Sequence, residues 1–129
     1  MNKILISLGM LIILAGCAAT PSEPDIPLSE VRPTPTCDNE VDCENMWVAA
    51  QSALQSVSGM RLAVANDNFA QTYPSTRVGV LDGQVRKERT EEGYRFVAAF
   101  GCGGHSWCNN MLNLNLSAFN AQVSRAKAL

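Results

Sequence analysis

The cysteines are the residues of this chain best suited to chemistry. Four of the five form two pairs with the same spacing, Cys37 with Cys43 and Cys102 with Cys108, and the second pair encloses the only histidine, His105. A cysteine thiolate can bind a metal ion or act as a nucleophile, whereas two thiols can join in a disulfide. Which chemistry applies depends on the redox compartment of the protein.

The residues before the fifth cysteine, Cys17, predict export. Lys3 precedes an apolar run over residues 4–14, and two small residues, Ala15 and Gly16, lead directly to Cys17. A positive start, an apolar centre and small residues before a cleavage site are typical of a secretory signal. The eleven residues of the run are also too few for a membrane span, which needs about 20.

The segment Leu14-Ala15-Gly16-Cys17 resembles a bacterial lipobox, where a peptidase cleaves before a lipid-modified cysteine. The resemblance covers residues 1–17. It implies that residues 1–16 are a signal peptide and that Cys17 carries acyl chains such as palmitate. In Gram-negative lipoproteins an aspartate after that cysteine favours the inner membrane, whereas Ala18 follows here and implies a periplasm-facing anchor in the outer membrane. A Gram-positive host would remove that distinction, and a plain secretory signal is the alternative to lipidation.

The mature chain is predicted to have a tether and one small domain. Five of the six prolines lie between residues 17 and 36, and so proline-rich a segment without periodic apolar residues predicts an extended tether. Residues 37–129 are then the folded domain. The nine basic and twelve acidic residues that follow the signal give no basic surface, so we expect no nucleic-acid binding.

Export favours two disulfides, because an even number of cysteines in an oxidising compartment pairs. Three connectivities are open, and closeness in sequence favours Cys37–Cys43 and Cys102–Cys108. The alternative is a zinc site in which Cys102, His105 and Cys108 are completed by a cysteine of the first pair. Oxidised cysteines do not coordinate zinc, so we predict no metal and no cofactor.

The apolar pattern predicts an α+β fold, with an antiparallel sheet of three to four strands and an N-terminal and a C-terminal helix packed on one face. The first helix is expected to be capped by Asp42 and to end at Gly59. Strands are expected over residues 60–65, 69–73 and 94–100. Residues 77–89 fit either a hairpin turning at Asp82-Gly83 or one long bulged strand. The last helix carries an apolar stripe of Leu112, Leu116, Phe119 and Val123.

The loop between Cys102 and Cys108 is the candidate binding loop. Its disulfide would order it before binding, and Trp107 could stack on a sugar or a partner side chain. The alternative, which we favour, is that Trp107 packs beneath the last helix and His105 is simply exposed. No catalytic motif accompanies them, so an enzyme is not expected.

Beyond the signal, the chain resembles small proteobacterial envelope lipoproteins of uncharacterised function. The matching segments are the two cysteine pairs, Met46-Trp47, Thr72-Tyr73-Pro74, Gly93-Tyr94-Arg95 and Ala118-Phe119-Asn120. The resemblance carries no activity. We expect a non-enzymatic lipoprotein that presents its domain to a periplasmic protein; the alternatives are a glycan or peptidoglycan binder and an inhibitor of a wall-degrading enzyme.

Replacing the predicted anchor tests this interpretation. Cys17→Ser should abolish cleavage by the lipoprotein peptidase and release the protein from the membrane fraction, because the acyl chains supply about 0.8 kcal/mol per buried methylene. Gel mobility and fractionation measure both effects. A Cys17→Ser variant that stays in the membrane with unchanged mobility would contradict lipidation.

Overall fold

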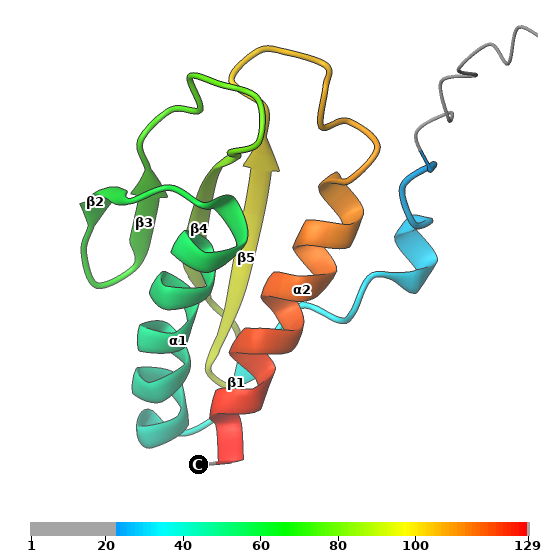
Figure 1. The fold of residues 1–129 in the computed structure, drawn as a ribbon. Coiled ribbons are helices and arrows are strands. Elements are labelled where there is room, and N and C mark those ends of the chain that lie inside the picture. The colour runs from blue at the N-terminus through cyan, green and yellow to red at the C-terminus, as the bar shows by residue number, and fades with distance from the viewer. Residues whose placement is uncertain (1–22, 129) are drawn as a thin grey trace, which may run out of the picture.

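The computed structural model describes residues 23–128, and a five-stranded antiparallel sheet with the order β1-β5-β4-β3-β2 is its centre. Two helices cover one face of this sheet (Figure 1). No helix in this part of the chain is long and apolar enough to cross a membrane. The elements, in chain order, are η1 (Leu28–Glu30), β1 (Thr36–Cys37), α1 (Glu40–Ser58), β2 (Leu62–Ala65), β3 (Phe69–Thr72), β4 (Asp82–Arg89), β5 (Tyr94–Gly101), α2 (Leu112–Arg125) and η2 (Ala126–Ala128).

The α+β class fits the structure, but two parts of the prediction are wrong. The sheet has five strands and not three to four, and the predicted N-terminal helix does not come first, because a strand precedes it. Strand β1 precedes α1 and pairs with the start of β5, where Thr36 lies opposite Arg95 and Cys37 opposite Tyr94. A strand of two residues has no periodic pattern, so it could not be predicted from apolar spacing.

Helix α1 begins earlier than predicted, because its cap is Asn39 and not Asp42. The Asn39 side chain accepts a hydrogen bond from the Asp42 backbone N–H at 2.9 Å, which satisfies one of the N–H groups that a helix start leaves free. The end is as predicted: Gly59 adopts the left-handed conformation with φ 74°, which favours glycine.

Strand β2 and the start of β4 also differ from the expected pattern. A register shift between Leu62 and Val64 sets Leu62 opposite buried Thr72 and Val64 opposite exposed Gln71, so these two apolar residues do not share a face. Asp82 opens β4, and neither the Asp82-Gly83 hairpin nor the long strand over residues 77–89 forms.

The core lies between the sheet and the two helices and has two parts. In the larger part, α1 and α2 pack on the inward positions of β4 and β5, with Phe96, Phe119, Met46, Leu54 and Val85 all less than 2% exposed. The inward alternation predicted for β5 and the apolar stripe of α2 therefore agree with the packing. The smaller part surrounds Cys102 and Cys108 at the opposite end of β5 from β1.

Both disulfides join the predicted partners, Cys37 with Cys43 and Cys102 with Cys108. The first ties β1 to the first turn of α1, and the second closes the loop between β5 and α2. In the chain-entropy model, a loop this short stabilises the folded state by about 2 kcal/mol.

The proline-rich residues 23–36, which we name the strap, bind α2 and are not the free spacer that we expected. The strap runs beside α2 before entering β1 (Figure 1). Asparagines of α2 and of the loop before it donate side-chain hydrogen bonds to its carbonyl groups. These bonds join Asn110 to Glu23 at 2.8 Å, Asn113 to Ile26 at 3.0 Å and Asn120 to Arg32 at 2.7 Å.

Asp25 of the strap caps α2. Its carboxylate accepts hydrogen bonds from the backbone N–H groups of Asn113 at 2.6 Å and Leu114 at 3.0 Å, the second and third positions of the helix. The residue at the helix's own cap position, Met111, makes no side-chain cap. A negative charge at this end also interacts favourably with the helix dipole. The predicted signal peptide and Cys17 lie outside the described residues.

Removing this cap should destabilise the domain. We expect Asp25→Ala to lower the free energy of unfolding by about 1–2 kcal/mol, the range for losing a helix cap. Asp25→Asn, which keeps an acceptor oxygen without the charge, should lose less. Glu23→Ala is the matched control, because Glu23 contributes its backbone carbonyl. Urea unfolding measures all three, and equal stability of Asp25→Ala and the parent would contradict the cap.

Candidate functional site

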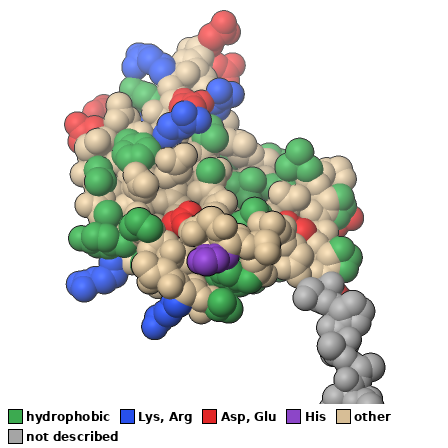
Figure 2. All heavy atoms as spheres, turned by 90° about the horizontal axis from the view of Figure 1, so that it is seen from above, with side chains coloured by type: hydrophobic (Ala, Val, Ile, Leu, Met, Phe, Trp, Pro, Cys, Tyr) green, Lys and Arg blue, Asp and Glu red, His purple; other side chains and the backbone are tan. Residues whose placement is uncertain are grey.

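The loops at one end of the molecule contain the candidate residues His105 and Trp107. We name this end, formed by residues 74–81 and 102–111, the loop end. Figure 2 looks down on this end and shows the histidine, in purple, on the surface with apolar side chains beside it. A hollow of about 430 Å³ lies there, lined by Thr76, Arg77, Val78, His105, Ser106 and Trp107.

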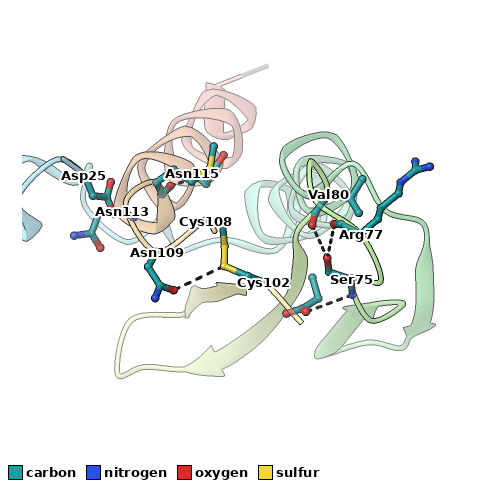
Figure 3. The surroundings of a disulfide bond; sticks show 11 residues. Asp25, Ser75, Arg77, Val80, Cys102, Cys108, Asn109, Asn113 and Asn115 are labelled. Atoms are coloured by element: carbon teal, nitrogen blue, oxygen red, sulfur yellow. Dashed lines mark hydrogen bonds between the residues drawn. A yellow bond between two sulfur atoms is a disulfide. The ribbon is translucent and has the colours of Figure 1, made fainter. Parts of the chain in front are cut away.

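Ser75 organises the first of these loops. Its hydroxyl group donates to the Val80 carbonyl at 2.6 Å and is 3.3 Å from the Arg77 carbonyl (Figure 3). The Asp82 carboxylate accepts from the Ser75 N–H. These contacts close residues 75–80 into a compact loop, which explains why residues 77–80 do not form a strand.

Gly103 joins the two loops. A Cβ atom at this position would overlap the Ser75 carbonyl oxygen, and the glycine φ of 65° is left-handed. Only a residue without a side chain fits so close to the neighbouring backbone. The loop end is therefore one packed surface and not two independent loops.

His105 is exposed and Trp107 is partly buried. Trp107 packs on the cluster of Leu81, Cys102 and Cys108, next to the start of α2. Its indole Nε1 is buried and has no hydrogen-bond partner within residues 23–128. The loop end thus combines one exposed imidazole with a tryptophan whose ring supports the disulfide.

The disulfides decide what the four cysteines of the domain can do. Each is joined to its partner, so none offers the thiolate that zinc binding or nucleophilic attack requires. The described residues contain no group of three or more side chains that could hold a metal ion.

A second candidate surface is the sheet face opposite the helices, which we name the open face. Its residues are the outward positions of β3, β4 and β5. Strand pairing sets Gln71 beside Gln84 and Gln84 beside Ala99 in one row, and Phe69 beside Arg86 and Arg86 beside Val97 in the next. A third row pairs Glu88 with Arg95, whose side chains form a salt bridge of 2.8 Å.

The open face is hollowed where its strands meet the loop end. This hollow has about 350 Å³ and is lined by Gln71, Pro74, Asp82, Gly83, Gln84, Ala99, Phe100 and Gly101. Its two amide groups and one carboxylate offer both hydrogen-bond donors and acceptors. Sequence reasoning missed this site, although the polar residues that alternate with buried ones along β4 were a signal for it.

No family model, curated protein or solved structure matches this chain. The lipobox residues lie outside the described part of the chain. Lipidation of Cys17 therefore stays a prediction from the sequence.

The two residues of the binding loop should respond differently to truncation. We expect Trp107→Ala to destabilise the domain by about 3 kcal/mol, the lower limit for a core tryptophan, because the ring is partly exposed. His105→Ala should change stability by less than about 0.5 kcal/mol.

Trp107→Phe is the control for this pair. It keeps an aromatic ring on the disulfide and removes an N–H group that has no partner among the described residues. Its loss of stability should therefore be clearly smaller than that of Trp107→Ala. Thermal unfolding measures the series. A fully stable Trp107→Ala variant would show that the ring does not support the loop.

Proposed function

We propose that this chain is a non-enzymatic envelope lipoprotein that presents the open face of its sheet to a periplasmic protein. Acyl chains on Cys17 hold it in the outer membrane, facing the periplasm. The lipobox resemblance supports the anchor, and the open face supports the binding role.

The observation that carries the binding role is the row of Phe69, Arg86 and Val97 across the open face. The Arg86 side chain is 57% exposed and lies between two partly buried apolar residues. Glu88 lies 3.2 Å from its guanidinium group and orients it. Arginine and aromatic residues dominate the energy of many protein interfaces, and a side chain on a rigid strand loses little freedom on binding.

A glycan is the second candidate partner, favoured by the hollow beside this row. Gln71, Gln84 and Asp82 line it, and amide and carboxylate groups can hydrogen-bond the hydroxyl groups of a sugar. Tyr73, which follows β3 and is 54% exposed, offers an aromatic ring nearby in sequence. If the protein partner is a wall-degrading enzyme, the chain would act as an inhibitor of that enzyme.

Two variants of the open face separate these partners. Arg86→Ala should reduce recovery of a crosslinked envelope protein, because it removes the exposed centre of the row. Gln84→Lys should reduce co-sedimentation with purified peptidoglycan if the hollow binds glycan. Both positions are exposed, so neither substitution should change stability by more than about 0.5 kcal/mol.

The matched control is Ser52→Lys, an exposed position on α1, which faces away from the open face. Capture by this control should equal that of the parent. Undiminished protein capture by Arg86→Ala together with undiminished sedimentation of Gln84→Lys would contradict a binding role of the open face.

A further inference from the structure

The strap changes where the predicted anchor joins the domain. Residues 23–36 bind α2, and the described part of the chain begins at Glu23, whose carbonyl group accepts a hydrogen bond from Asn110 of the loop end. Figure 1 shows this start of the strap beside the first turn of α2, at the same end as the loop that contains His105. The chain that leads to the predicted anchor therefore joins the domain at the loop end.

The remaining chain between the anchor and the domain is short. Five residues lie between Cys17 and Glu23, and the six steps from one Cα atom to the next span at most about 22 Å. A free chain from Cys17 to Thr36 could span about three times as much. Docking of the strap thus keeps the loop end near the bilayer, whatever path residues 17–22 take.

We propose that the loop end docks on the surface of the bilayer that holds Cys17. The inference rests on the proposed lipid anchor. In this orientation the loop end contacts the membrane and the strands run away from it. The open face then points sideways into the periplasm, where a partner can reach it.

The chemistry of the loop end suits a lipid surface. Val78 is 75% exposed and Arg77 lies beside it, and no carboxylate is among the residues that line the hollow between them and Trp107. An arginine is attracted to an anionic bilayer surface, and an exposed valine adds apolar contact. Both contributions are small, but the anchor makes the contact intramolecular, which raises the effective concentration to about the millimolar range.

The far end of the molecule carries charges of both signs. Carboxylates of the α1 start and of the β4–β5 turn share pockets there with basic side chains, namely Lys87, Arg89 and Lys127. At the loop end, Arg77 is accompanied by the carboxylates of Glu23 and Asp25 in the strap. The fourteen residues of α2, about 21 Å long, separate the two ends. The proposed orientation therefore follows from where the strap attaches and not from a difference in charge.

Fluorescence quenching in vesicles tests the orientation. The lipidated full chain is labelled at Val78→Cys with an environment-sensitive dye and reconstituted into vesicles of phosphatidylethanolamine and phosphatidylglycerol with a nitroxide on some headgroups. The matched control carries the dye at Glu91→Cys, on the far turn. We expect several-fold stronger quenching at position 78 than at position 91, and Ser106→Cys on the second loop should match position 78 if Val78→Cys misfolds.

Releasing the strap provides a second comparison. Asp25→Ala combined with Asn113→Ala should reduce the difference between positions 78 and 91, because the longer chain lets the domain tumble. Vesicle flotation comes first: a protein that does not float contradicts the anchor itself. Floating protein with equal quenching at both positions would overturn the docking proposal. So would a dye at position 78 that responds to added envelope protein and not to lipid.

Discussion

The cap that Asp25 places on α2 is the contact on which the position of the strap, and the structure of the first turn of α2, depend. The carboxylate satisfies two backbone N–H groups at a helix start whose own cap position is Met111. Unpaired N–H groups at a helix end need a partner, and this one lies 88 residues away. The strap is therefore part of the fold, although its proline content is typical of a linker.

The strap and the two disulfides each stabilise a different part of this small domain. The Cys37–Cys43 bond secures β1 to α1, the Cys102–Cys108 bond secures the loop end, and the strap covers α2 between them. A domain of this size buries a modest share of its surface. Each of these links therefore contributes a substantial part of its net free energy of unfolding. The sheet can then leave one face free of helices, which is the face that we propose for binding.

The sequence predicted the features that are periodic or local. Alternation marked β5, the stripe from Leu112 to Val123 marked α2, and spacing favoured the correct disulfide pairs. The misses were contacts between distant residues: the two-residue strand β1, the register shift in β2 and the docking of the strap. The asparagines of α2 were a signal for the strap, since an amide-rich helix face can donate hydrogen bonds to backbone carbonyl groups. No pattern near them in the sequence identified the strap as their partner.

Amide hydrogen exchange in the folded protein tests the docked strap most directly. If Asp25 caps α2, the N–H groups of Asn113 and Leu114 should exchange as slowly as that of Asn115, which donates to the Met111 carbonyl within the same turn. Rates for Asn113 and Leu114 close to those of an unfolded chain, with Asn115 still protected, would contradict the account. The strap would then be a free tether, and the loop end would have no fixed relation to the membrane.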